Sequence, residues 1–91
     1  MKPGCTLIAH LHAKPEKRDE LLKLLQSFVK PSRAESACVE YHLHVSNDDP
    51  NLFVFYENWR TREGLVYRMT RLSLETHARG MRLPAPLFPA S

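Results

Sequence analysis

The sequence has few cysteines and glycines and lacks the common motifs of phosphate and nucleophile sites. Its two cysteines, Cys5 and Cys38, are far apart and lack a metal-type spacing, so we expect reduced thiols. There is no Cys-x-x-Cys pair, glycine-rich phosphate loop or Gly-x-Ser-x-Gly elbow. These absences give no indication of a phosphate-binding loop, a paired-cysteine site or a serine-hydrolase nucleophile.

Long apolar runs are also missing. No segment approaches the ~20 apolar residues of a membrane helix, and the first apolar run is too short and too rich in histidine for a signal peptide. With 13 Lys and Arg residues against 10 Asp and Glu, the net charge is only +3, and the two signs are mixed along the chain. We therefore expect a cytoplasmic protein that binds neither membranes nor nucleic acids.

The length predicts one domain over residues 1–91, with its core in 6–80 and a proline-rich arm or short edge strand in 81–91. Apolar and polar residues alternate in 6–13 and 39–46, and aromatic residues fill 52–59, so these ranges are the expected strands. Helical spacing begins at residue 16, and we expect Pro31 to kink or interrupt that helix. Thr61 suits the N-cap of a second helix and Gly80 its end.

This order of elements predicts an α+β fold, a ferredoxin-like β-α-β-β-α-β unit with an antiparallel sheet. Helices would cover only one face of that sheet, yet apolar residues also occur on the other, as at Ile8, Val54 and Tyr56. The simplest cover for this second face is the same face of another copy, so we expect a homodimer.

Within 39–46, alternation places four residues on one face, namely Val39, Tyr41, Leu43 and Val45.

A carboxylate lies inside the aromatic strand 52–59. One face of that strand carries Phe53, Phe55, Glu57 and Trp59. Burying Glu57 without a partner would cost several kcal/mol or raise its pKa. Glu57 therefore either has a partner, such as Arg68 or Arg33, or lies in a cavity that water or a ligand can enter.

Two His-x-His pairs each place both imidazoles on one strand face. Four imidazoles could bind zinc, copper or iron, but strand 52–59 separates the two pairs by about 10 Å. The histidines also face the expected partner subunit, so we predict no metal site. The predicted dimer interface consists of Ile8, His10, His12, His42, His44, Val54 and Tyr56.

Two runs carry a resemblance to a known family. Residues 31–41 (Pro-Ser-Arg-Ala-Glu-Ser-Ala-Cys-Val-Glu-Tyr) and 53–59 (Phe-Val-Phe-Tyr-Glu-Asn-Trp), the latter followed by Arg-Thr-Arg-Glu, resemble signatures of the antibiotic biosynthesis monooxygenase (ABM) domain family. The likeness covers roughly residues 6–74. It implies a dimeric α+β barrel of two ferredoxin-like units packed sheet to sheet, with a ligand pocket between sheet and helices in each subunit.

The resemblance implies a small cofactor-independent monooxygenase of quinol- or anthrone-like phenolic substrates. Such an enzyme must deprotonate its substrate, because the electron-rich anion reduces O₂ directly, and it needs a dry aromatic cavity. The candidate catalytic residues are Glu57, Trp59 and Arg68. The candidate substrate-binding residues are Tyr41, Phe55, Leu65 and His77.

Other functions are compatible with the same fold. Family members often carry a histidine where this chain has Arg68, and the family's second helical histidine is also replaced. This favours a non-catalytic small-molecule-binding or interaction module as the alternative. An isomerase of a small metabolite would need a cation such as Arg68 in the pocket, and a metal-dependent activity would need the paired histidines.

Overall fold

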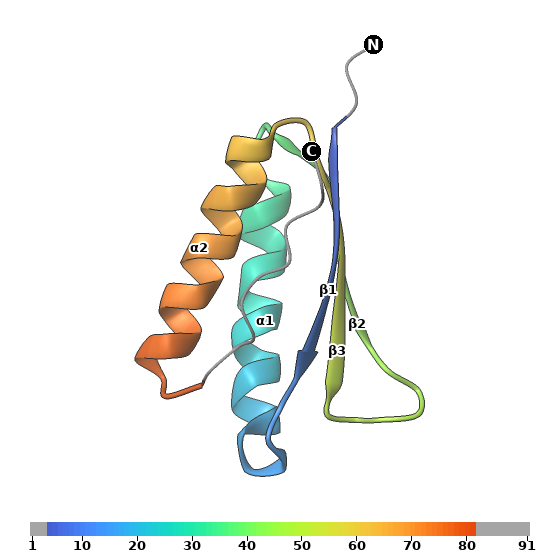
Figure 1. Ribbon diagram of the computed structural model, residues 1–91, viewed down its shortest axis with the longest axis vertical. Coiled ribbons are helices and arrows are strands. Elements are labelled where there is room, and N and C mark those ends of the chain that lie inside the picture. Colours follow the sequence, from blue (N-terminus) through green and yellow to red (C-terminus); the bar gives the residue numbers. More distant parts are fainter. Residues whose placement is uncertain (1–3, 82–91) are drawn as a thin grey trace.

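The computed structural model describes residues 4–81 as one sheet backed by two helices (Figure 1). The elements in chain order are β1 (Cys5–His12), the short 3-10 turn η1 (Pro15–Lys17), α1 (Arg18–Arg33), β2 (Cys38–Val45), β3 (Leu52–Trp59) and α2 (Arg62–Ala78). The expected strands and helices are therefore present, each within a residue or two of its predicted limits. The expected edge strand or arm at 81–91 lies outside the described residues, apart from Met81.

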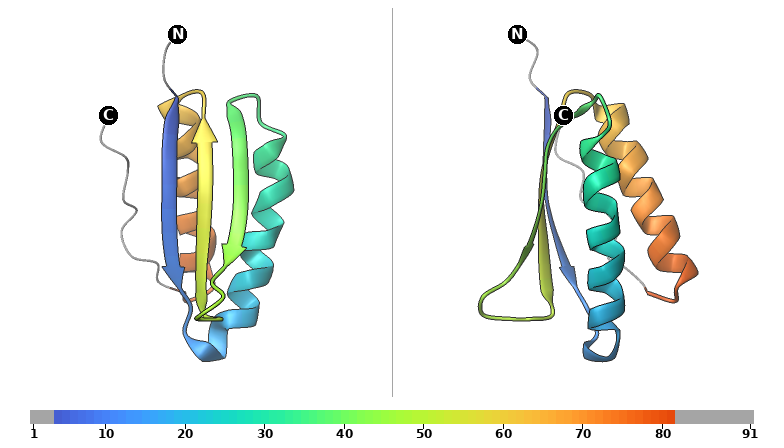
Figure 2. Two further views of the ribbon diagram at one scale, coloured as in Figure 1. Left: turned by 90° about the vertical axis from the view of Figure 1, so that its right-hand side faces the viewer. Right: turned by 180° about the vertical axis from the view of Figure 1, so that it is seen from behind.

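The three strands form an antiparallel sheet in the order β1-β3-β2. Both helices pack on one face of this sheet, and the two views in Figure 2 show the other face without a helix. This arrangement is the predicted ferredoxin-like α+β fold, and it places β3 at the centre of the sheet.

The core lies between the sheet and the helices. The period of two in β3 turns three of its four aromatic side chains toward the helices, and these three, Phe53, Phe55 and Trp59, are fully buried. Helix α1 contributes one apolar face, made of Leu21, Leu24, Leu25 and Phe28. The predicted faces of β1 are also confirmed, because Leu7 and Leu11 are buried while their neighbours are exposed.

The predicted limits of α2 are confirmed, whereas the expected interruption of α1 at Pro31 is wrong. The Thr61 hydroxyl accepts a hydrogen bond from the Gly64 backbone N–H at 3.1 Å, as an N-cap does. Gly80 follows α2 with φ +73°, which is the left-handed conformation that ends helices. Helix α1 passes through Pro31 and ends at Arg33. Pro31 lies in the exposed last turn, so the carbonyl that loses its partner can bond to water.

The predicted face of β2 is wrong at its beginning. An irregularity in the β2–β3 register lies between Cys38 and Glu40, where Cys38 pairs with Trp59 and Glu40 with Asn58. Val39 is thus the extra residue of a β-bulge and is 54% exposed. Beyond the bulge Tyr41 is buried as predicted, whereas Val45 at the end of β2 is 40% exposed.

The face of the sheet that lacks helices carries the residues predicted for a dimer interface. Ile8 is 56% exposed on it, and the His42 ring stacks on Tyr56 with ring centroids 6.5 Å apart. In the described part of the chain, no helix combines the length and apolarity needed to span a bilayer.

Candidate functional site

The centre of the candidate site is a hydrogen bond between two side chains of β3. The Trp59 indole Nε1–H donates to Glu57 Oε1 at 2.9 Å. Glu57 is 1% exposed and Trp59 is fully buried. Residues two apart on a strand share a face, which is why these side chains can meet. This is the only side-chain hydrogen bond that Glu57 makes within residues 4–81.

The environment of Glu57 favours its neutral form. Burial raises the pKa of the Glu57 carboxyl from 4.5 to about 7, and the hydrogen bond from Trp59 opposes the rise. A carboxyl with this pKa exchanges its proton near neutral pH. General acid–base catalysis works best with such a pKa, so Glu57 is suited to accept a proton from a bound substrate.

Aromatic side chains enclose Glu57 on the helix-covered face. Tyr41 pairs with Glu57 across the β2–β3 ladder, and its ring lies 4.9 Å from Phe55 and 6.2 Å from Trp59 by centroids. Leu65, from the first turn of α2, is also fully buried. Burial and then the nearby Glu57 charge raise the pKa of Tyr41, so this phenol stays protonated at neutral pH.

Arg68 does not take the position expected of it. Its guanidinium pairs with Glu35 at 3.1 Å and lies over the Phe28 and Tyr67 rings, at 6.0 and 5.6 Å. Within residues 4–81 no ion pair joins Glu57 to Arg68.

Arg33, the other predicted partner of Glu57, is also engaged elsewhere. Its Nε donates to the Tyr41 carbonyl at 2.9 Å. The ion-pair interpretation of Glu57 is therefore wrong in the described part of the chain, and an indole takes the place of the cation.

His77 lies apart from this cluster. It is exposed near the end of α2, three residues before Gly80. The structure therefore brings together Tyr41, Phe55, Glu57, Trp59 and Leu65 of the predicted site, and places Arg68 and His77 elsewhere.

Sequence reasoning missed how closely α2 approaches Trp59. A Cβ atom on Gly64 would lie 2.8 Å from Ala37 Cβ and 3.1 Å from Trp59 Cε3. Gly64 thus allows the N-terminus of α2 to pack on the indole. The signal in the sequence was a glycine inside an expected helix, where it lowers helix stability without an evident local reason.

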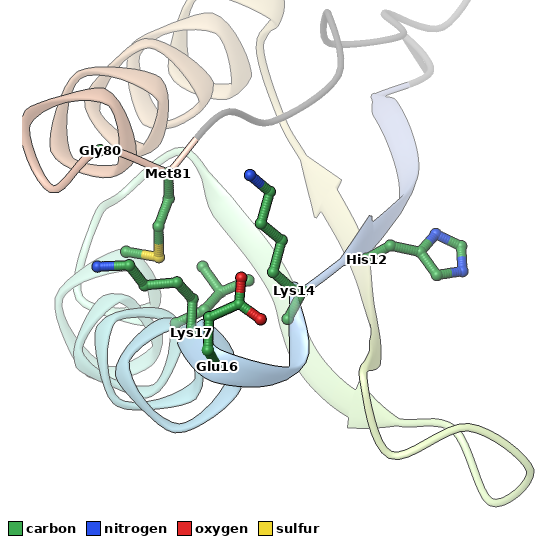
Figure 3. A pocket seen from close by; sticks show the side chains of 8 residues that line it. His12, Lys14, Glu16, Lys17, Gly80 and Met81 are labelled. Carbon is green, nitrogen blue, oxygen red and sulfur yellow. The ribbon is translucent and has the colours of Figure 1, made fainter.

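Two of the cavities in the described part of the chain lie away from Glu57 and Trp59. One, of about 120 Å³, lies at the end of β1 beside Lys14, Lys17 and Met81 (Figure 3). His12 there pairs with Leu52, seven residues along β3 from Trp59. At about 3.3 Å per residue, this cavity lies roughly 20 Å from the candidate site. The other cavity lies between α1 and α2.

The two His-x-His pairs lie on different strands, on either side of β3. Among residues 4–81, no three His, Cys, Asp or Glu side chains gather closely enough to hold a metal ion. His10 and His44 both pair with Val54, from opposite sides of β3, which keeps the two histidine pairs apart.

Relatives found by sequence match about two thirds of the chain. A 58-residue segment is 38% identical to the uncharacterised protein sll1783 of Synechocystis, covering 64% of this chain and 40% of that protein. A 61-residue segment is 38% identical to YcnE of Bacillus subtilis, a proposed monooxygenase by its name, covering 67% of this chain and 64% of YcnE. The chain thus spans less than two thirds of the length of these relatives.

Solved structures match over nearly the whole length. PA3566 of Pseudomonas aeruginosa is 29% identical with a TM-score of 0.79, covering 100% of this chain and 98% of that one. Rv0793 of Mycobacterium tuberculosis is 30% identical with a TM-score of 0.72, covering 97% and 99%. The model of the family described as antibiotic biosynthesis monooxygenase matches residues 5–69, which is most of the chain. The chain therefore belongs to the antibiotic biosynthesis monooxygenase family.

Proposed function

We propose that this protein is a cofactor-independent monooxygenase that oxidises quinol- or anthrone-like phenolic substrates beside Glu57. The observation that carries the proposal is the buried Glu57 carboxyl, whose pKa is raised to about 7 by burial and whose described partner is the Trp59 indole. Such a group can take a phenolic proton at neutral pH. Family membership and the proposed monooxygenase YcnE support the same class of reaction.

The proposed reaction needs no oxidant other than O₂. Glu57 takes the O–H proton of a quinol or the acidic C–H proton of an anthrone. The substrate anion then passes electrons to O₂ and forms a C–O bond to it, and the peroxide takes the proton back from Glu57. Loss of water from the resulting peroxide then leaves a carbonyl at that carbon. For an anthrone, the balance is one anthrone and one O₂ to one anthraquinone and one water. The enclosing aromatic side chains would exclude bulk water and so strengthen the electrostatic interactions of the bound anion.

The side chains around Glu57 have distinct proposed roles. Trp59 positions the carboxyl through its Nε1–H, because it contacts Glu57 at 2.9 Å. Tyr41, Phe55 and Leu65 provide apolar contact area for a flat aromatic substrate. Because Glu57 is only 1% exposed, substrate binding requires a local opening of the packing around it.

Oxygen uptake with a panel of hydroquinones and anthrones tests the proposal. We expect turnover that rises with pH through about 7, because Glu57 must be ionised to accept the proton. The Glu57→Gln variant should lose roughly 100-fold in kcat/KM. Glu63→Gln, an equal charge change in the exposed first turn of α2, is the matched control and should keep wild-type rates.

Two results would overturn this assignment. One is an absence of enzyme-dependent uptake with every member of the panel. The other is equal uptake by the Glu57→Gln and Glu63→Gln variants, because it would show that the carboxyl does not accept the proton.

We also propose that the protein is a homodimer joined through the face of the sheet that lacks helices. The exposure of Ile8 and the adjoining Val54 and Tyr56 supports this, because a contiguous apolar surface is usually an interaction surface. The histidines of β1 and β2 would then lie within or around the interface. We also propose that the protein is located in the cytoplasm.

A non-catalytic small-molecule-binding module is the second candidate function. The full burial of Glu57 and the engagement of Arg68 by Glu35 favour it, because the cation expected to stabilise a phenolate at Glu57 contacts Glu35 instead. It predicts that phenolic ligands raise the melting temperature without oxygen uptake. An isomerase that needs Arg68 beside the substrate finds less support, since Arg68 contacts Glu35 instead.

A further inference from the structure

A groove between the two helices lies outside the candidate site. Its volume is about 380 Å³, within the range of small-molecule pockets. Helices α1 and α2 run side by side and diverge toward the end of α2 (Figure 2). The residues that line the groove come from these two helices and from the residue after α2, and none comes from a strand.

Each helix contributes a regular stripe of side chains to the groove. On α1 the stripe follows the spacing i, i+3, i+4, i+7, and on α2 the spacing i, i+3, i+7, i+11, so each stripe is one helical face. The α1 stripe is Leu24, Ser27, Phe28 and Pro31. The α2 stripe is Arg68, Arg71 and Glu75, continued by Arg79, the C-cap residue that follows the helix.

The two stripes differ in chemistry. Three of the four α1 residues are apolar, with Leu24 and Phe28 buried, whereas all four α2 residues are charged. Two helices usually bury apolar stripes against each other. Here α2 turns its apolar residues Leu65 and Leu72 elsewhere, which leaves an apolar wall facing a charged one.

The charged wall has an excess of positive charge. Arg68, Arg71 and Arg79 carry three positive charges and Glu75 one negative charge, so the lining is +2. Glu75 approaches Arg71 only at 3.8 Å, and Glu35, which is not in the lining, takes one amino group of Arg68. Within residues 4–81, the buried Arg68 Nε has no hydrogen-bond partner. Guanidinium donors are thus left for an added anion.

We propose that this groove binds an amphipathic organic anion, with an apolar body and a carboxylate or sulfonate group. The apolar body would lie against Leu24 and Phe28, and the acidic group would take hydrogen bonds from the arginines of α2. A carboxylate, or two of the three oxygens of a sulfonate, can accept paired hydrogen bonds from the forked guanidinium donors. The inference does not depend on the oxygenase reaction, because Glu57 and Trp59 do not line this groove.

Fluorescence titration with anilinonaphthalene sulfonate, an aromatic body with one sulfonate, tests the proposal on the native protein. Ser27→Glu adds a negative charge in the groove, and Gln26→Glu adds the same charge at the neighbouring exposed position outside it. We expect saturable binding that Ser27→Glu weakens about tenfold or more and Gln26→Glu leaves within about twofold. Circular dichroism confirms that both variants fold.

A second pair of variants tests the arginines. Arg79→Gln should weaken binding about tenfold, whereas Arg62→Gln, an exposed arginine of α2 outside the groove, should not. Raising the salt concentration from roughly 0.05 to 0.5 M should also weaken binding by the wild type. Absence of saturable binding, or equal affinities within either pair of variants, would overturn the proposal.

Discussion

Replacing Glu57 by glutamine should stabilise the protein, by an amount that grows with pH. The pKa of this carboxyl is about 7 in the folded chain, compared with an ordinary value of 4.5. Between these values the folded state holds a proton that the unfolded state has released. The contribution of Glu57 to the free energy of unfolding is therefore fully present below pH 4.5 and is lost as the pH rises through about 7.

The size of the effect follows from the two pKa values. They differ by about 2.5, and at 1.36 kcal/mol per pKa unit the ionised carboxyl costs ~3 kcal/mol above pH 7. Glutamine avoids this cost because it does not ionise, and its Oε1 can still accept the Trp59 N–H. For a domain of this size, ~3 kcal/mol corresponds to a melting-temperature rise on the order of 10–20 °C.

Thermal unfolding of the wild type and Glu57→Gln at pH 5 and pH 8.5 measures this difference. Protein concentration is held constant, because dimerisation makes the melting temperature depend on it. Glu16→Gln, at an exposed position of η1, is the control for the charge change. We expect the melting temperature of Glu57→Gln to exceed that of the wild type by much more at pH 8.5 than at pH 5. An equal gain at both pH values, or a loss at pH 8.5, would refute the reasoning.

Three further predictions concern packing, capping and assembly. Gly64→Ala should destabilise the protein by ~1–3 kcal/mol, because the added Cβ would lie 2.8 Å from Ala37 Cβ, and this outweighs the higher helix propensity of alanine. A urea unfolding midpoint at or above that of the wild type would contradict this. Thr61→Ala should cost ~1 kcal/mol through loss of the cap, and an unchanged midpoint would show that the cap contributes nothing. Ile8→Asp should convert the proposed dimer to a folded monomer in sedimentation velocity, whereas wild-type sedimentation would place the interface elsewhere.

Much of the fold could be predicted because it follows from local backbone geometry. Alternation with a period of two is imposed by the strand itself, so Leu7 and Phe53 could be assigned to the buried face without knowledge of their neighbours. Thr61 and Gly80 mark the limits of α2 because capping and left-handed backbone depend on one residue and its immediate surroundings.

The features that sequence reasoning missed depend on pairing between distant segments. The bulge at Val39 arises where β2 meets β3, and one extra residue reverses the face of every residue before it. The contact between Arg68 and Glu35 depends on how α2 lies beside the segment after α1. Charge and spacing along the chain do not fix either arrangement.

The candidate site was predicted in part. A lone carboxylate on an aromatic strand face indicated that Glu57 would be buried, and it is. The expected partner was a cation, because cations give the strongest compensation for a buried charge. The partner is instead the indole of Trp59, two residues away. A neutral N–H donor suits a carboxyl that is partly protonated at pH 7. Whether these residues catalyse a reaction stays a prediction.

Titration of the Glu57 side-chain carbon by NMR tests the central claim most directly. Uniform ¹³C labelling of glutamate makes the carboxyl carbons visible, and the spectrum of the Glu57→Gln variant identifies the signal of Glu57 by its absence. The account predicts a titration midpoint of about 7 for this signal. A midpoint at or below the ordinary value of 4.5 would show that the carboxyl is ionised throughout the neutral range, and would contradict the proposed role of Glu57.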